Sequence, residues 1–281
     1  MDTLPAAGEL RTLAEILALD ELLPLAWRTA LAAGAFLRDE RPADLAVQTK
    51  STATDAVTVM DKGAEDLIIG ALLGARPGDG FLGEEGGERA GSTGIRWVVD
   101  PLDGTINYLY RLPMWGVSIA AEEHGTSRIG IVVAPDLDEA YIGVRGGGAW
   151  LVRGERAERL HVRECAAASQ AMVVTGFSYR AHVRERQADV VRSLITQVRD
   201  IRRLGAAVID LCWLARGRID CFYEKYLNRW DIAAGTLIAA EAGAVVDGLT
   251  TGATDAFLFA CVPGVAEEVR ALLAQGGALD A

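Results

Sequence analysis

The sequence predicts a layered fold of helices and sheets, and three observations lead to this prediction. Apolar residues recur at helical spacing near the start of the chain, short strand-like segments cluster in its middle, and strands alternate with helices after about residue 170. Alternating strands and helices favour sheets covered by helices, while clustered strands favour antiparallel pairing. We therefore expect sheets of mixed direction packed between helical layers.

The first half of the chain contains two helical regions followed by strands. Residues 12–41 read as two helices or as one helix interrupted near Pro24, and residues 59–76 read as a helix ended by Pro77 and Gly78. The expected buried face of the helix over 59–76 consists of Ala64, Leu67, Ile68, Ala71 and Leu72. The expected strands are 80–84, 96–100, 117–122, 128–134 and 140–144, the last three as a meander.

The second half alternates between the two kinds of element. The expected strands are 171–175, 201–203, 219–223 and 256–260, and the expected helices are 181–200, 206–216, 231–243 and 264–275. A chain of 281 residues can form one large domain or two closely packed ones. We expect a single unit over residues 1–281, with an N-terminal α+β half of about 1–165 and a C-terminal α/β half of about 166–281.

Composition and charge exclude several classes of partner. The formal net charge of −11 disfavours binding to nucleic acid or to an anionic membrane. No apolar run approaches the roughly 20 residues that a membrane span requires, and the acidic start of the chain does not resemble a signal peptide. The four scattered cysteines show no metal spacing and are expected to be reduced core thiols. These features predict a cytoplasmic protein.

Acidic residues stand beside turn residues in four short segments. These segments are DAVTVMD with Asp55, Thr58 and Asp61; LGEEGG with Glu84 and Glu85; WVVDPLDGTIN with Asp100 and Asp103; and NRWDIAAG with Asp231. Each segment taken alone has a structural explanation. Thr58 and Asp61 fit a helix capping box, Asp231 fits a helix N-cap, Glu84 and Glu85 fit a solvated loop, and the Asp-Pro and Asp-Gly pairs fit a tight turn.

The segment DPLDGT favours a functional explanation. It follows the apolar run Trp97-Val98-Val99, so its acids should emerge at the carboxyl end of a buried strand, where open α/β sheets bind ligands. Asp100, Asp103 and the carbonyl of Leu102 are hard oxygen donors of the kind that Mg²⁺ prefers. Gly104 and Thr105 would begin a helix or turn whose free N–H groups can hold phosphate.

These segments resemble the inositol monophosphatase family. Its signature W-x-x-D-P-[LI]-D-G-T-x-N matches residues 97–107, and its signature W-D-x-A-A-G matches residues 230–235. The upstream K…D-x-V-T-x-x-D element matches at Lys50, Asp55, Val57, Thr58 and Asp61, and the G-E-E element at Gly83, Glu84 and Glu85. All four elements occur in the family's order between about Lys50 and Gly243, which makes their combination specific.

The resemblance implies a fold, an activity and roles for individual residues. The implied fold is a layered α-β-α-β-α sandwich, shared with fructose-1,6-bisphosphatase, and the implied protein is a lithium-sensitive homodimer that binds two to three Mg²⁺ ions. Glu84, Asp100 and the Leu102 carbonyl would bind the first ion, Asp100, Asp103 and Asp231 the second, and Glu84 a third. Asp61 and Thr105 would activate the attacking water, and the N–H groups of Gly104 and Thr105 would hold the phosphate.

The resemblance also implies a small phosphate monoester as substrate, with inositol monophosphate as the first expectation. Glu224 precedes Asp231 by seven positions, the offset at which inositol-cleaving members carry a Glu that accepts hydrogen bonds from ring hydroxyls. The family's G-[ST]-A-A loop stands here as Gly205-Ala206-Ala207, without the hydroxyl. Histidinol phosphate, fructose 1,6-bisphosphate and 3′-phosphoadenosine 5′-phosphate remain alternatives, as does a regulatory binding module that keeps the fold.

Overall fold

The computed structural model describes residues 9–42, 47–49, 56–248 and 257–278, and for residues 47–49 and 56–58 it describes the backbone alone. Lys50 and Asp55, together with the start of the expected strand 256–260, therefore lie outside the described residues. The side chain of Thr58 lies outside them as well.

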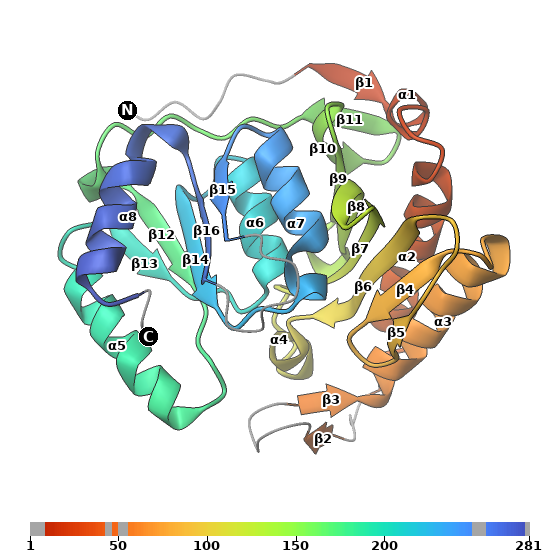
Figure 1. Cartoon of the computed structure of the whole chain (residues 1–281), viewed down its shortest axis with the longest axis horizontal. Helices are drawn as coiled ribbons and strands as arrows, with labels where there is room; N and C mark the ends of the chain where they lie inside the picture. The colour runs from red at the N-terminus through yellow and green to blue at the C-terminus, as the bar shows by residue number, and fades with distance from the viewer. Residues whose placement is uncertain (1–8, 43–46, 50–55, 249–256, 279–281) are drawn as a thin grey trace.

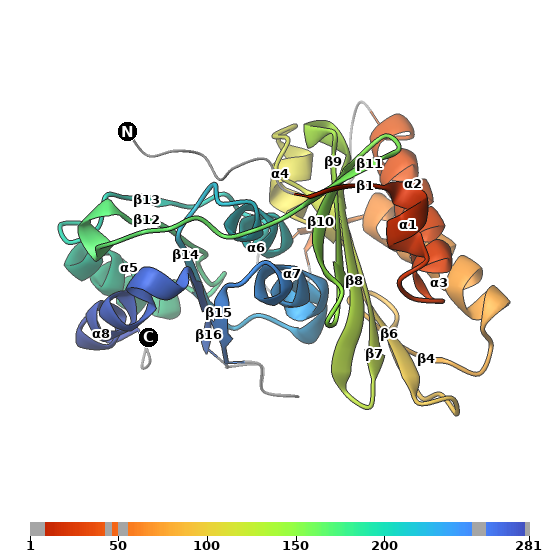
Figure 2. The same ribbon diagram turned by 90° about the horizontal axis from the view of Figure 1, so that it is seen from above.

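The described residues form five layers, in the order helices, sheet, helices, sheet, helices (Figures 1 and 2). The larger sheet has nine strands in this part of the chain. In order across the sheet they are β1 (Leu10–Thr12), β11 (Arg156–Arg159), β10 (Gly148–Arg153), β9 (Glu139–Val144), β8 (Thr126–Ala134), β7 (Gly116–Glu123), β6 (Ile95–Asp103), β4 (Gly80–Gly83) and β5 (Gly87–Arg89). The strands β2 (Val47–Thr49) and β3 (Ala56–Thr58) form a separate antiparallel pair.

The smaller sheet has five strands among the described residues. They are β13 (Asp200–Arg202), β12 (Met172–Thr175), β14 (Cys221–Lys225), β16 (Phe257–Cys261) and β15 (Val245–Asp247), in order across the sheet. The first three run parallel, and the last two are antiparallel to their neighbours. The prediction of layered sheets of mixed direction is therefore confirmed.

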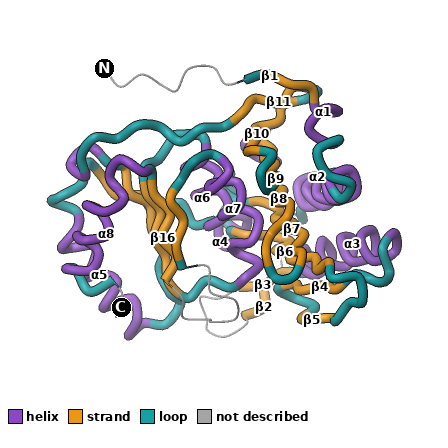
Figure 3. Tube along the Cα trace, turned by 45° about the horizontal axis from the view of Figure 1, so that its top comes forward, coloured by secondary structure: helices purple, strands orange, loops and turns teal. Residues whose placement is uncertain are grey.

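The helices cover both sheets. On the outer face of the larger sheet lie α1 (Leu13–Leu17), α2 (Leu23–Asp39) and α3 (Val59–Ala75). Between the sheets lie α6 (Ala207–Ala215) and α7 (Arg229–Glu241), as Figure 3 shows in purple. On the outer face of the smaller sheet lie α5 (Ala181–Leu194) and α8 (Ala266–Gln275). The shorter elements are α4 (Thr105–Leu109), η1 (Pro135–Leu137), η2 (Ala168–Gln170) and η3 (Pro263–Val265).

The middle helical layer is fixed by close packing against the larger sheet. A Cβ added to Gly130 of β8 would lie 2.8 Å from the Cα of Ala234, and one added to Gly143 of β9 would lie 2.9 Å from the side chain of Ile238. Glycine at these two positions therefore lets α7 contact the strands directly. The apolar residues between the two sheets, which include Val98, Val132, Ala233 and Ile238, form a buried cluster of their own. This packing sets where the first turn of α7 lies.

Most expected elements are confirmed, and several details are corrected. Residues 12–41 form two helices, and Pro24 lies in the first turn of the second one instead of interrupting a single helix. Helix α5 ends at Leu194 and not at residue 200, because residues 200–202 pair with β12 as β13. Helix α7 begins at Arg229, two residues before the expected start.

Two further expectations concern the buried face of α3 and the state of the cysteines. Ala71 was expected to be buried and is exposed, while the other expected members of the α3 face are buried or half-buried. All four cysteines are free and buried, which confirms that they are core thiols. The strands β1, β2, β3, β5, β10, β11 and β15 were not expected from the sequence. In the part of the chain that the structure describes, no helix is both long enough and apolar enough to cross a lipid bilayer.

Candidate active site

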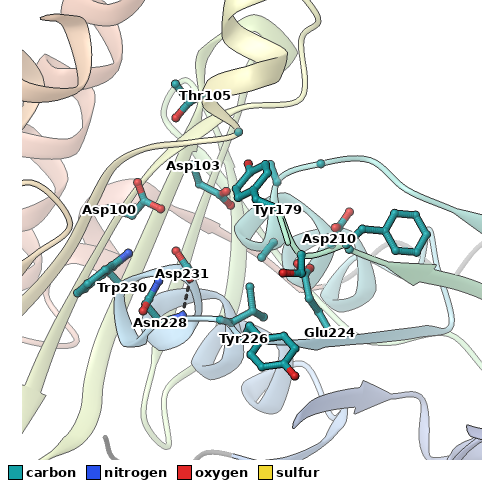
Figure 4. Close-up of a pocket in the computed structure, with 18 of the residues that line it drawn as sticks. Asp100, Asp103, Thr105, Tyr179, Asp210, Glu224, Tyr226, Asn228, Trp230 and Asp231 are labelled. Carbon is teal, nitrogen blue, oxygen red and sulfur yellow. Dashed lines mark hydrogen bonds between the residues drawn. The ribbon is translucent and has the colours of Figure 1, made fainter. Parts of the chain in front are cut away.

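A cavity of about 710 Å³ opens where the two halves of the chain meet (Figure 4). Its wall contains all but one of the expected site residues: Glu84, Asp100, Leu102, Asp103, Gly104, Thr105, Gly205, Ala206, Ala207, Glu224 and Asp231. The remaining one, Asp61, is buried behind Thr105 and joined to it by a hydrogen bond. Residues separated by up to 170 positions in the sequence therefore reach one place.

The two acids of the DPLDG segment face the cavity because strand β6 carries a bulge. Asp100 pairs with Ser118 and Asp103 with Gly116, so two residues of β6 face one residue of β7 between these pairs. In a regular strand, residues three apart point to opposite faces, and the extra residue returns Asp103 to the side of Asp100. The segment is thus a bulged strand with Pro101 at the irregularity, and not the tight turn that the sequence suggested.

Backbone N–H groups hold three of the carboxylates in place. Asp103 Oδ2 accepts a hydrogen bond from the Val208 N–H at 2.7 Å, which caps the start of α6 from a distant segment. Asp100 Oδ1 accepts from the Leu102 N–H at 2.9 Å. Asp231 is the third residue of a capping box in which its Oδ2 accepts from the Asn228 N–H at 2.5 Å (Figure 4). Asp231 is therefore not the N-cap itself, since Asn228 occupies that position.

The carboxylates of this wall raise one another's pKa. Burial raises the pKa of Asp103 to about 7. The hydrogen bond from the Val208 N–H group and the charge of Arg203 lower this pKa, while the charges of Glu224 and Glu84 raise it. Burial is also the main cause for Asp100 and Asp231, whose pKa values are raised well above the usual range, with Glu84 and Asp103 contributing to both. Such a cluster of acids is electrostatically costly unless a cation neutralises it.

The donor set fits Mg²⁺. It consists of carboxylate oxygens and the Leu102 carbonyl, which are the hard oxygen donors that Mg²⁺ prefers, and the mutual repulsion of the acids calls for positive charge. Among the residues that the structure describes, however, no three His, Cys, Asp or Glu side chains are gathered closely enough to hold an ion as they stand. The expected metal ligands therefore line one cavity, but among the described residues they do not lie close enough together to surround an ion.

Thr105 links the cavity to the buried Asp61. Its Oγ1 lies 3.1 Å from Asp61 Oδ1 and 3.1 Å from the Leu102 carbonyl oxygen, and it can donate its proton to either acceptor. Thr105 is the first residue of α4, and Gly104 precedes it with a φ of 87°. A Cβ at Gly104 would also lie 2.7 Å from the Met114 carbonyl oxygen, so glycine is required there for both reasons.

The opposite wall of the cavity comes from the C-terminal half. Gly205, Ala206 and Ala207 lie at the start of α6, and Glu224 lies in β14, where Gly176 leaves room for its carboxylate because a Cβ would collide with it. Burial raises the pKa of Glu224 to about 8, with Arg203 opposing the rise and Asp231 adding to it. Asn107 connects the two walls, since its Nδ2 donates to the carbonyls of Met114 at 2.6 Å and Leu204 at 2.8 Å.

Glu65 is a positioning residue that sequence reasoning missed. It is 2 % exposed on α3, and its Oε2 accepts a hydrogen bond from the Glu85 N–H at 2.9 Å. Added Cβ atoms at Gly83 and Gly86 would each lie 2.5 Å from this carboxylate. The loop that carries Glu84 is therefore wrapped around Glu65. The one available signal was an acid beside Ala64 on the buried face of the helix.

Glu122 and Arg229 form a second missed contact, which fixes the start of α7. The Glu122 carboxylate is fully buried on β7, and its two oxygens accept from Arg229 Nε at 2.5 Å and Arg96 Nη2 at 2.6 Å. Arg229 Nη2 also donates to Ser127 Oγ at 3.1 Å. Because Arg229 lies two residues before Asp231, this ion pair anchors the turn that presents the Asp231 carboxylate.

Comparisons with known proteins agree with this geometry. A model of the inositol monophosphatase family matches residues 18–278. The inositol-1-monophosphatase SuhB of Mycobacterium tuberculosis is 40 % identical over 279 residues, which cover 92 % of this chain and 95 % of the relative. The Nus factor SuhB of Pasteurella multocida is 36 % identical over 258 residues, covering 89 % of this chain and 95 % of the relative.

A solved structure with the same architecture is the crystal structure of the extragenic suppressor protein suhB from Bartonella henselae. It superposes with a TM-score of 0.83 at 32 % identity, covering 92 % of this chain and 100 % of that one. Together with the family match over most of the chain, these similarities identify the five-layer fold and its chemistry. The chain therefore belongs to the inositol monophosphatase family and is a phosphoric monoester hydrolase.

Proposed function

We propose that this protein hydrolyses inositol monophosphate to inositol and phosphate, with Mg²⁺ as cofactor and water as nucleophile. The observation that carries the proposal is the cavity wall on which Glu84, Asp100, Asp103 and Asp231 meet Glu224. The family match and the names of the inositol-1-monophosphatase relatives support the substrate. We further propose that residues 1–281 act as one catalytic unit, in a lithium-sensitive homodimer located in the cytoplasm.

The roles proposed for the metal ligands follow the family pattern. Glu84, Asp100 and the Leu102 carbonyl would hold one Mg²⁺, Asp100, Asp103 and Asp231 a second, and Glu84 a third, which gives two to three ions per site. When bound, Mg²⁺ supplies positive charge for the phosphate oxygens and lowers the pKa of bound water. The hydrogen bonds from Val208, Leu102 and Asn228 leave each of these aspartates a second oxygen that can bind a cation.

Asp61 and Thr105 are proposed to activate the water. The Thr105 hydroxyl accepts a proton from water and passes its own to Asp61, which its position 3.1 Å from Asp61 Oδ1 supports. The water oxygen then bonds to phosphorus while the bond from phosphorus to the inositol oxygen breaks. The inositol oxygen takes up a proton from solvent water, and Asp61 returns its proton to solvent after the reaction. The N–H groups of Gly104 and Thr105 would hold the phosphate oxygens.

A phosphate-release screen tests the function directly. Inositol 1-phosphate, histidinol phosphate, fructose 1,6-bisphosphate and 3′-phosphoadenosine 5′-phosphate would be compared at equal concentration, with and without Mg²⁺ and lithium. We expect inositol 1-phosphate to give the highest kcat/KM, with no turnover in excess chelator. If another of these esters gave a higher kcat/KM, that ester would be assigned as the substrate in place of inositol 1-phosphate. The assignment of the protein as a phosphatase would not change.

Magnesium is expected to stabilise the folded protein, because it neutralises acids that repel one another. A free Mg²⁺ concentration about 100-fold above its Kd contributes about 2.7 kcal/mol, or roughly 5 °C in Tm for a chain of this size. Differential scanning calorimetry in chelator and in Mg²⁺ measures the shift. The Asp103→Asn variant should show a much smaller shift. An equal shift in both proteins would argue against Asp103 as a ligand.

Glu224→Gln is expected to weaken recognition of the polyol more than the chemistry. A carboxylate accepts hydrogen bonds from two hydroxyls, whereas an amide accepts through one atom only. The KM for inositol 1-phosphate should rise about 10-fold, as expected for one lost hydrogen bond, with a smaller effect on an aryl phosphate. Glu185→Gln, on the exposed face of α5, is the control. Equal effects of the Glu224 variant on both esters would show that Glu224 does not recognise the hydroxyls of the polyol.

The name of the Pasteurella relative favours a second candidate function, a regulatory contact with the transcription machinery. The two functions can coexist in one chain, because the cavity occupies one region of the surface. A catalytically dead variant such as Asp103→Asn separates them, since a regulatory contact should survive the loss of turnover.

A further inference from the structure

Asp210 is a buried acid whose presence in an apolar helix the proposed mechanism does not explain. It lies in α6, is 1 % exposed and lines the cavity, where Figure 4 shows it on the same side as Glu224. Its Oδ1 is buried and has no hydrogen-bond partner among the residues that the structure describes. A buried carboxyl oxygen left unpaired is costly, and such groups in folded proteins usually have a partner from the protein, water or a ligand.

The charges around Asp210 favour its neutral form. Burial raises its pKa well above the usual range, the nearby carboxylates of Glu224 and Asp103 raise it further, and Arg203 opposes them. A neutral carboxyl group both donates and accepts a hydrogen bond, as a hydroxyl group does. The group therefore matches the hydrogen-bonding pattern of an alcohol, and its surroundings disfavour an additional anion.

Asp210, Ala206 and Gly104 line the same cavity. The Asp210 N–H donates to the carbonyl of Ala206, the N-cap residue of α6, at 3.0 Å, so Asp210 lies one helical turn after it. Side chains on a helix lean toward its N-terminus, which directs the Asp210 carboxyl toward Ala206. The Ala206 methyl offers it no partner, and Ala206 in turn packs near Gly104, with 3.1 Å to an added Cβ there.

We propose that Asp210 is a specificity-determining residue that binds a hydroxyl group of the substrate, next to the hydroxyls that Glu224 receives. Together, the carboxyl groups of Asp210 and Glu224 select a ring that carries hydroxyls on neighbouring carbons. Asp210 lies one helical turn from Ala206, which packs near the proposed phosphate-binding position at Gly104. This inference rests on the proposed function and extends it to a residue outside the family's signature segments.

Two esters that differ only in their hydroxyls test the proposal. Inositol 1-phosphate and cyclohexyl phosphate share the six-membered ring and the phosphate, so the ratio of their KM values measures recognition of the hydroxyls. Asp210→Ala and Asp210→Leu remove the carboxyl, the first leaving space and the second filling it. Both should raise the KM for inositol 1-phosphate about 10-fold more than the KM for cyclohexyl phosphate. Asp210→Asn keeps a donor and an acceptor and should retain most of the discrimination.

The outcomes separate this inference from the proposed function. Wild-type enzyme that does not prefer inositol 1-phosphate over cyclohexyl phosphate overturns the proposed substrate and the subsite together. A wild-type preference that survives in the Ala and Leu variants overturns the subsite alone, as does an equal rise in both KM values, which a purely structural role would produce. Asp189→Asn, an exposed acid on α5, is the control and should leave both KM values unchanged.

Discussion

Asp231→Asn and Asp103→Asn are expected to lower kcat by about 10³-fold at saturating Mg²⁺, because a lost ligand removes several kcal/mol of charge stabilisation from the transition state. The fold should be retained. An asparagine oxygen at either position can still accept the hydrogen bond that the aspartate receives, from Asn228 at 2.5 Å or from Val208 at 2.7 Å. Phosphate release and circular dichroism measure the two effects.

Stability in chelator gives these variants a second signature. Each removes one negative charge from a cluster in which the acids raise one another's pKa, so Tm in chelator should be equal to or higher than that of the wild type. Asp66→Asn, on the exposed side of α3, is the matched control and should change neither activity nor Tm. Rates like those of the wild type in either active-site variant would overturn the assignment of the site.

Glu122→Gln is expected to destabilise the protein by about 3 kcal/mol, because it leaves the guanidinium groups of Arg96 and Arg229 without their buried anion. For a chain of this size, the loss corresponds to roughly 5 °C in Tm. The variant should also bind Mg²⁺ about 10-fold more weakly, since Arg229 anchors the turn that carries Asp231. Calorimetry of unfolding and titration with Mg²⁺ measure the two quantities.

The neighbouring residue provides the control for this prediction. Glu123 is the next acid in β7, its side chain is 43 % exposed, and its contact with Arg128 is a long 3.4 Å. Glu123→Gln should therefore change stability by less than about 0.5 kcal/mol. If the two variants melted at the same temperature, the buried ion pair would contribute no more than a surface one. If Glu122→Gln lost stability but kept wild-type Mg²⁺ affinity, its link to Asp231 would be wrong.

The sequence predicted the long elements of the fold well and the short strands poorly. Helices α3 and α6 and strands β7 to β9 carry strong apolar patterns of their own and were found within a few residues. Strand β10 was missed because Gly146, Gly147 and Gly148 read as a turn that ends the meander, although Gly148 is the first residue of β10 and its residues up to Val152 are buried. The end of α5 was missed because pairing of residues 200–202 with β12 overrides the local helical pattern.

The candidate site was found where its residues form local motifs and missed where they do not. Asp100, Asp103 and Asp231 stand in short segments that can be recognised, whereas Glu65, Glu122 and Asp210 are single acids inside regular elements. In a sequence, such an acid reads as a solvated residue, and its burial depends on tertiary contacts. For Asp210, the sign of burial in the sequence was the pair of apolar neighbours, Ile209 and Leu211.

The cavity wall draws its acids from both halves of the chain, and this has a consequence for the protein during its synthesis. Glu84, Asp100 and Asp103 are translated long before Glu224 and Asp231. A nascent chain that has been synthesised through β11, the last strand of the larger sheet, therefore carries three of the acids of the site. It still lacks α7, the helix that supplies Asp231. Activity should consequently appear in a single late step of translation, when α7 docks between the sheets.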